Sequence, residues 1–180
     1  MDSERSKIIR AKKDIKYFDS IYDKYYPKIN NFVFHRVKDE SICNEIVSNV
    51  FFKAMKRLSI FRFYNSRYCG FSSWLYRIAL SELNQYFHER KREKIIQKNY
   101  KWNTPKGQSI KMNFEEIEKL IQELKLDEQN LIALRFYEKL SYREIGEILK
   151  KNEGAVKVKM HRIMNKLRNK LTQEINYERS

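Results

Sequence analysis

Hydrophobic residues recur at helical spacing in several stretches of the chain, separated by short polar segments. The first two stretches cover residues 18–33 and 43–58, and each places its apolar side chains on one face of a helix. A third helix, from about Ser72 to Arg92, has a wider apolar arc. No alternating pattern is long enough to indicate a strand, so the sequence predicts an all-α fold. The inward-facing residues of the second stretch are Cys43, Val47, Val50, Phe51, Ala54 and Leu58.

A polar segment interrupts the helical pattern near the middle of the chain. Residues 93–113 are mostly polar and contain the sequence Pro-Lys-Gly, and helical signals resume at Phe114. We therefore expect two small helical domains, residues 1–92 and 114–180, joined by a flexible linker. Fully extended, this linker reaches ~70 Å at about 3.4 Å per residue.

Residues 140–171 contain two helical patterns placed back to back. Ser141 and Glu144 form a capping box that starts the first helix, and Asn152 has the side chain of an N-cap for the second. Two helices joined by a tight turn make a helix-turn-helix, whose second helix can enter the DNA major groove. The second helix has an apolar stripe that faces a core: Val156, Met160, Ile163, Leu167 and Leu171.

The charge of the chain limits the class of partner. There are 38 Lys and Arg residues against 23 Asp and Glu, giving a formal net charge of +15. This excess favours nucleic acid as the partner, with an anionic membrane surface as the weaker alternative. No apolar run approaches the ~20 residues that span a bilayer, and no signal peptide opens the chain. The two cysteines form no CxxC pair, which indicates a reduced, cytoplasmic protein.

The second helix of the predicted helix-turn-helix has a cationic outer face. A two-helix corner with a merely solvated basic face is the alternative, but the net charge favours DNA binding. Val158 lies near the start of this helix, where its methyl groups can touch a thymine methyl, although single exposed valines are also ordinary. The candidate DNA contacts of this domain are Arg135, Asn152, Gly154, Lys157, Val158, His161, Arg162 and Lys166.

The outward face of the helix at residues 43–58 has the composition of a protein-binding patch. It combines an exposed Phe and Met with a carboxylate one or two turns earlier. The alternative is that Phe52 packs within its own domain. The predicted patch consists of Glu45, Ser48, Asn49, Phe52 and Met55.

The third helix carries a narrow polar stripe that ends in cations and follows an aromatic-rich loop. Hydrogen-bonding groups beside cations suit strand backbone and base edges, and aromatic faces stack on unpaired bases. Some rings cap the core instead, which we expect of Phe61, Phe71 and Trp74. The candidate contacts with a melted strand are Tyr64, Asn65, Arg67 and Tyr68 in the loop, and Arg77, Ser81, Asn84, His88 and Arg90 on the helix.

Three segments together resemble a known family. The segment "LDEQNLIALRFYEKLSYREIGEILKKNEGAVKVKMHRIMNKLRNKL" resembles region 4 of bacterial RNA polymerase sigma factors. "NEIVSNVFFKAMKRL" and "FSSWLYRIALSELNQYFHERKR" are similar to parts of region 2. The order and spacing, without a middle domain, are similar to the extracytoplasmic-function (ECF) group. This chain departs from the family at the turn of the helix-turn-helix, where Lys150 stands in place of the usual Gly.

The resemblance implies a role for each predicted surface. The patch around Phe52 would bind the clamp helices of core RNA polymerase. The loop and polar stripe would melt and hold the minus-ten element of promoter DNA, and the helix-turn-helix would read the minus-thirty-five element. Members of this group are typically bound by an anti-sigma factor, so such a partner is expected.

Two other functional classes fit the sequence less well. A stand-alone helix-turn-helix regulator would use its N-terminal half to sense a ligand or to dimerise, and would need no polar stripe on an otherwise buried helix. An enzyme is disfavoured, because the three histidines lie far apart, with no acidic pair, nucleophile or glycine-rich phosphate loop. No cofactor and no metal site are expected.

Overall fold

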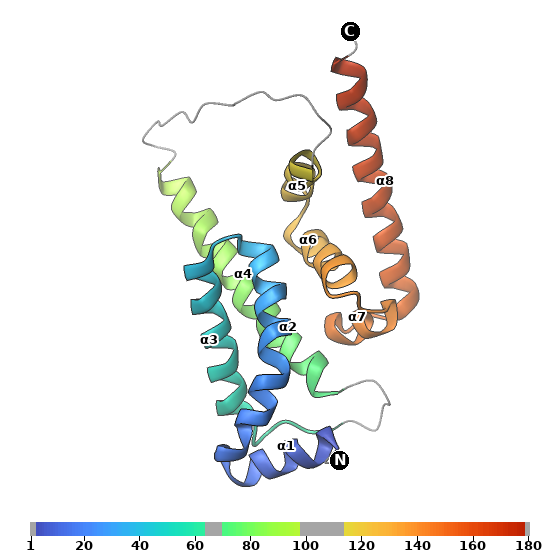
Figure 1. The fold of residues 1–180 in the computed structure, drawn as a ribbon. Coiled ribbons are helices and arrows are strands. Elements are labelled where there is room, and N and C mark those ends of the chain that lie inside the picture. The colour runs from blue at the N-terminus through green and yellow to red at the C-terminus, as the bar shows by residue number, and fades with distance from the viewer. Residues whose placement is uncertain (1–2, 64–69, 98–113, 179–180) are drawn as a thin grey trace.

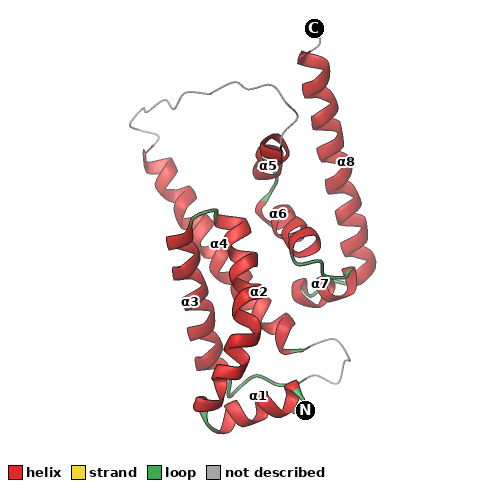
Figure 2. Cartoon of the chain, in the orientation of Figure 1, coloured by secondary structure: helices red, strands yellow, loops and turns green. Residues whose placement is uncertain are grey.

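The computed structural model describes residues 3–63, 70–97 and 114–178. Within these ranges every regular element is a helix, which confirms the predicted all-α class (Figures 1 and 2). None of these helices is long and apolar enough to cross a membrane. The elements are α1 (Glu4–Lys13), η1 (Ile15–Phe18), α2 (Asp19–Val37), α3 (Glu40–Arg57), α4 (Phe71–Gln97), α5 (Phe114–Gln122), α6 (Leu126–Ile132), η2 (Ala133–Tyr137), α7 (Tyr142–Leu149) and α8 (Glu153–Glu178).

The first domain is a bundle of α2, α3 and α4, with α1 lying across one end (Figure 1). The apolar stripes predicted for α2 and α3 face inward, and all six residues assigned to the α3 stripe are buried. Asp39 starts α3 as its N-cap, since its Oδ1 accepts a hydrogen bond from the Ile42 amide at 3.0 Å. Burial of each large apolar side chain stabilises the bundle by roughly 1.5–3 kcal/mol.

Helix α1 was not anticipated from the sequence. Ser3 caps its N-terminus, and Ile8 and Ala11 bury one narrow side against the bundle. Two of its cations hold the segment that follows α3. The Lys12 ammonium donates to the Phe61 carbonyl at 2.8 Å, and the Arg5 guanidinium lies 5.3 Å from the centre of the Phe63 ring.

Helix α4 is longer than its apolar pattern predicts. It continues to Gln97, so residues 93–97, assigned to the linker, are helical. The physical reason is that Glu, Lys, Ile and Gln sustain a helix even without an apolar stripe, and no Gly or Pro interrupts them. The second domain begins with α5 at Phe114, where helical signals were expected to resume.

The second domain contains the predicted helix-turn-helix, formed by α7 and α8. The capping box of Ser141 and Glu144 is present, and the Asn152 side chain accepts from the Ala155 amide at 2.6 Å at the start of α8. The turn between the helices is tight. Lys150 adopts the left-handed conformation with φ 55°, and a Cβ at Gly146 would lie 2.6 Å from the Lys151 carbonyl oxygen.

Helix α6 runs directly into a π-helical turn, η2, before the chain reaches α7. The π-turn adds a residue to the helical repeat, which changes the direction of the side chains that follow. Glu138 donates its amide to the Ala133 carbonyl at 3.2 Å, five residues back. Tyr137 and Glu138 consequently lie against α2 and α4 of the first domain, so the two domains are in direct contact.

Candidate nucleic-acid and protein interfaces

The outer face of α3 carries the predicted protein-binding patch. Glu45, Ser48, Asn49, Phe52 and Met55 are all exposed, and the Phe52 side chain is 54% accessible. This exposure rules out the alternative that Phe52 packs into the core of its own domain. The Lys56 ammonium lies 4.4 Å from the centre of the Phe52 ring. An exposed aromatic ring beside an exposed Met is a suitable anchor for a protein partner.

The polar stripe of α4 is divided between solvent and the second domain. Ser81, His88 and Arg90 are exposed. Asn84 is half-buried, and its Oδ1 accepts a hydrogen bond from Asn130 Nδ2 of α6 at 3.1 Å. Arg77 is also half-buried, and its Nε is enclosed without a hydrogen-bond partner.

Part of this stripe borders a basic cavity of about 550 Å³. Arg77 and Ser81 line it together with the Trp74 ring. Four other cations, none of them predicted as a strand contact, also line it: Lys53, Arg57, Arg62 and Lys150. Lys53 and Arg57 are four residues apart and so lie on one side of α3. This spacing could have revealed the cationic side of the helix from the sequence. Among the described residues that line the cavity, Glu82 is the only acid, and both of its oxygens accept from Lys53 at 2.7 Å.

The aromatic loop before α4 is anchored by rings that belong to the core. Phe61 and Phe71 are buried, as expected, with their ring centres 5.4 Å apart at 83°. Trp74 is half-buried and packs on both rings, which supports a core position for most of its surface. The other loop candidates, Tyr64, Asn65, Arg67 and Tyr68, lie outside the described residues.

The outer face of α8 presents the predicted upstream contacts. Val158 is 52% accessible, and His161 and Arg162 are exposed beside it. Lys157 is exposed as well and pairs with Glu153 one turn earlier at 2.7 Å. Asn152 and Gly154 sit at the helix N-terminus, where free amides suit a phosphate group. These residues form one continuous surface on the second helix of the helix-turn-helix.

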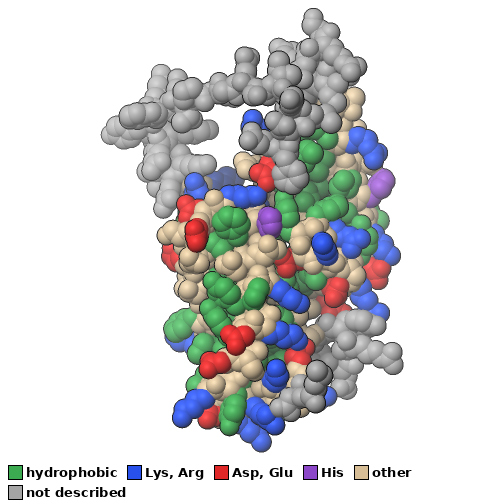
Figure 3. Space-filling view, viewed as in Figure 1, with side chains coloured by type: hydrophobic (Ala, Val, Ile, Leu, Met, Phe, Trp, Pro, Cys, Tyr) green, Lys and Arg blue, Asp and Glu red, His purple; other side chains and the backbone are tan. Residues whose placement is uncertain are grey.

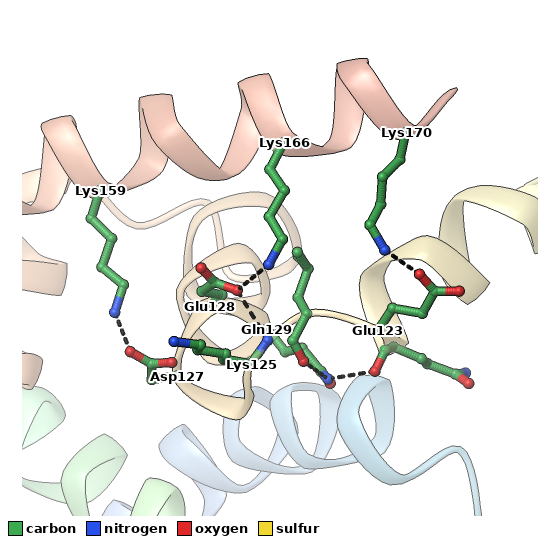
Figure 4. Close-up of polar contacts among 10 residues, drawn as sticks. Glu123, Lys125, Asp127, Glu128, Gln129, Lys159, Lys166 and Lys170 are labelled. Atoms are coloured by element: carbon green, nitrogen blue, oxygen red, sulfur yellow. Dashed lines mark hydrogen bonds and ion pairs between the residues drawn. The ribbon is translucent and has the colours of Figure 1, made fainter. Parts of the chain in front are cut away.

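Lys166, another of the predicted upstream residues, ties α8 to a different helix of its own domain. The Lys166 ammonium lies 3.3 Å from a Glu128 oxygen, on the side of α8 that faces α6. Figure 4 shows Lys166 in a row with Lys159 and Lys170, which pair with Asp127 and Glu123. Their side chains therefore join α8 to the rest of the domain.

Arg135 is likewise engaged within the domain. Its Nη1 donates to the Leu140 carbonyl at 2.8 Å, and its guanidinium lies 4.6 Å from the Tyr142 ring centre. A helical wheel of α8 alone did not show the pairing of Lys159, Lys166 and Lys170, because their acidic partners lie on α6 and in the turn between α5 and α6.

The structure thus contains two basic surfaces, the outer face of α8 and the cavity beside α4, and one apolar patch on α3. Figure 3 shows Lys and Arg side chains along α8 and at the α1 end of the first domain. A helix-turn-helix with an exposed cationic second helix defines a DNA-binding protein. The exposed protein-binding patch on α3 of the first domain indicates that this protein works with a protein partner.

Comparisons with known proteins define the family. The model for sigma-70 region 2 matches residues 21–93, and the model for sigma-70 region 4 matches residues 114–167. The chain therefore belongs to the sigma-70 family of RNA polymerase sigma factors and has the two-domain architecture of the ECF group.

Individual relatives and solved structures agree with this assignment. The chain is 28% identical over 171 residues to the RNA polymerase sigma factor YlaC of Bacillus subtilis, covering 89% of this chain and 95% of the relative. It is 25% identical over 164 residues to the ECF RNA polymerase sigma factor SigX of the same organism, covering 84% and 81%.

Two solved structures share the fold. CnrH, in complex with the cytosolic domain of CnrY, matches with a TM-score of 0.69 at 17% identity over 96% of this chain and 99% of that chain. The sigma factor RpoE of Bartonella quintana, in complex with the anti-sigma factor NepR, matches with a TM-score of 0.64 at 19% identity over 87% and 98%.

Proposed function

We propose that this sigma factor binds core RNA polymerase through the exposed face of α3 and directs the enzyme to specific promoters. The observation that carries the proposal is the combination, in one chain, of the Phe52 patch on region 2 and the basic outer face of α8 on region 4. A stand-alone regulator would need only the second of these surfaces. The protein acts by binding alone, in the cytoplasm, without catalysing a reaction.

Each DNA element is assigned to one domain. On region 4, Val158, His161 and Arg162 project from the middle of the outer face of α8 and read bases of the minus-thirty-five element. Lys157 supplies phosphate contacts, with Asn152 and Gly154 at the helix N-terminus. Arg135 and Lys166 stabilise region 4 through contacts within the domain. They contribute to DNA binding through the positive charge that they add to the domain.

On region 2, the polar stripe of α4 binds the melted minus-ten element. Ser81 and Arg77 border the basic cavity, which is lined by cations that attract phosphates and by Trp74. Asn84, His88 and Arg90 continue the stripe along the helix. Tyr64 and Tyr68, with Asn65 and Arg67 between them in the sequence, are proposed to hold an unstacked base.

A protein regulator is also proposed. The related CnrH was solved with the cytosolic domain of CnrY, and RpoE with the anti-sigma factor NepR. By analogy, an anti-sigma factor holds this chain inactive until a signal releases it.

Transcription in vitro tests the proposed function. Core RNA polymerase and genomic fragments are incubated with and without the purified protein, and the transcripts are mapped. We expect new start sites that share upstream and downstream elements only when the protein is present. Co-purification with core polymerase is measured in parallel. A stable dimer that binds a palindrome and fails to associate with polymerase would favour the rival regulator.

A further inference from the structure

Region 4 is docked on region 2 through the π-turn η2. The Glu138 carboxylate, which follows this turn, accepts a hydrogen bond from Asn31 Nδ2 of α2 at 2.8 Å and another from the Tyr76 hydroxyl of α4. The Tyr137 ring stacks on the His35 imidazole with centroids 3.9 Å apart and planes 10° from parallel. The added residue of the π-turn gives both side chains their direction toward region 2.

A second set of bonds joins α6 to the polar stripe. Asn130 is 3% exposed, and its side chain bonds to α2 and α4 of region 2. Its Oδ1 accepts from Arg36 Nε at 3.0 Å, and its Nδ2 donates to Asn84 Oδ1 at 3.1 Å. Arg36 also donates to Gln129 at 2.8 Å. Asn84, proposed above to read the promoter strand, is therefore already occupied by region 4.

Helix α7 covers the other end of the stripe. Ser73 donates to Glu147 at 3.5 Å, and Lys150 lines the basic cavity together with Arg77 and Ser81. The contacts of region 4 thus extend along α4 from Ser73 to Asn84. They include Arg77 and Asn84 of the stripe that the melted strand would use, whereas Ser81, His88 and Arg90 of that stripe remain exposed.

We propose that the stripe on α4 is a shared docking surface, which region 4 occupies in the free protein and the non-template promoter strand occupies after the domains separate. This inference rests on the proposed function of the stripe. It makes region 4 an internal competitor of single-stranded DNA, so the free protein is closed and binds such DNA weakly.

In the described part of the chain, the contact between region 4 and region 2 leaves polar atoms without hydrogen-bond partners, which favours separation of the domains. Among the described residues, three enclosed side-chain atoms lack a hydrogen-bond partner, namely His35 Nδ1, Arg36 Nη2 and Arg77 Nε. All three belong to region 2 residues at the contact with region 4. Enclosing a polar group without a partner costs free energy that is recovered when water or a ligand reaches it. Opening would expose Arg77 for a phosphate and would relieve the other two groups.

The polar character of the contact also favours release. Most of its specific interactions are hydrogen bonds between side chains, together with the Lys38–Glu118 ion pair at 2.7 Å. Polar contacts between domains of one chain resemble transient interfaces and permit relative motion. The interface therefore favours one arrangement of the two domains but allows them to separate.

Distance measurements on the full-length protein test the closed state. Spin labels are attached at Asp23→Cys in α2 and Asn169→Cys in α8, in a Cys69→Ser background, since both labelled positions are exposed. The unmodified interface should give one narrow distance distribution. Glu138→Arg removes the carboxylate that accepts from Asn31 and Tyr76 and should broaden the distribution. Glu123→Arg is the matched control, because it makes the same charge change on region 4 within a pair that faces Lys170.

Binding to a mixed-sequence single-stranded DNA of 12 nucleotides tests the competition. Glu138→Arg should bind this probe at least about fivefold more tightly than Glu123→Arg, and Arg77→Ala should remove that gain. If Glu138→Arg does not fold, Asn31→Asp, an exposed change that repels Glu138, replaces it, with Asn44→Asp on the exposed side of α3 as its control. A broad distribution in the unmodified protein overturns the closed state.

Open domains without tighter DNA binding overturn the shared surface. These results are separate from those on transcription. The proposed function fails if core polymerase is not bound, whereas the shared surface fails if domain opening and single-strand binding are unlinked.

Discussion

The imidazole of His35 lies parallel to the phenol ring of Tyr137, so the last turn of α2 in region 2 is stacked on the π-turn of region 4. Burial lowers the pKa of His35, and the nearby Lys38 ammonium lowers it further. The Glu138 and Glu118 carboxylates raise the pKa of His35, but by less than burial and Lys38 lower it. The closed arrangement therefore prefers the neutral imidazole.

This preference predicts a pH dependence of domain opening. In the open state His35 is solvated and takes up a proton near its ordinary pKa of about 6.5. Above that value both states are neutral and the closed state keeps its full stability. As the pH falls below it, the open state binds the proton more readily and becomes favoured. The spin-label distance distribution should broaden between about pH 7.5 and 5.5. His35→Phe should remove the pH response, whereas His161→Gln, on the exposed face of α8, should retain it.

Substitution of Phe52 tests the polymerase patch. Phe52→Glu should lower affinity for core RNA polymerase by about tenfold or more, because a charge buried in an interface without a partner is costly. Helix content should not change, since the side chain is exposed. Tyr17→Glu is a matched control at a ring that is 55% accessible and outside the patch. Unfolding of Phe52→Glu, seen by circular dichroism, would contradict the assignment.

The left-handed Lys150 offers a test of strain in the turn. Lys150→Gly should raise the free energy of unfolding by about 0.5–1 kcal/mol. Relief of the left-handed conformation is worth roughly 1–2 kcal/mol, and the added freedom of glycine in the unfolded chain removes about half of it. Lys151→Gly changes the same residue type at a position without positive φ and should not stabilise. Urea denaturation measures both variants.

Substitution of Gly146 by alanine has two opposing effects on the stability of the protein. Alanine is a better helix former than glycine by about 0.8–1.0 kcal/mol. At this position, however, the added Cβ meets the Lys151 backbone carbonyl at 2.6 Å, so the turn must move. We expect Gly146→Ala to lose at least about 1 kcal/mol of stability, because the overlap exceeds the gain in propensity. Gly154→Ala, whose Cβ would meet only Asn152 Oδ1 at 3.5 Å, should keep wild-type stability in the same denaturation experiment.

Two cations of α8 should differ in their effect on DNA binding. Arg162→Ala removes a side chain able to bind guanine in a bidentate manner, and should cost ~1–3 kcal/mol and relax preference at one base pair. Lys157→Ala should weaken binding to all sequences equally and reduce the salt slope by about one. Binding to a promoter and to its single-base variants is titrated at several salt concentrations. Equal losses on every sequence for both variants would exclude base reading by Arg162.

Local patterns predicted the individual helices well. The Ser141–Glu144 capping box, the Asn152 cap and the exposure of Phe52 all depend on residues within a few positions of one another, so their spacing alone was sufficient. Helix α1 was missed because only Ile8 and Ala11 are buried on it, which is too short a stripe to stand out.

Contacts between distant residues were not predictable in this way. The bonds of Asn130 to Arg36 and Asn84, and of Lys166 to Glu128, depend on how the helices pack. A helical wheel marks Asn84 and Lys166 as outward-facing but does not show what lies opposite. The π-turn before Glu138 has no sequence signature comparable to a cap, although it decides where that side chain points.

The contacts of α1 have a practical consequence for anyone tagging this protein. Arg5 contacts the Phe63 ring and Lys12 binds the Phe61 carbonyl, so α1 lies beside the end of region 2 proposed to open DNA. A bulky fusion partner placed ahead of Ser3 would crowd that end. Reporter or affinity fusions at the amino terminus should thus be compared with carboxyl-terminal ones before a loss of transcription is attributed to any point mutation.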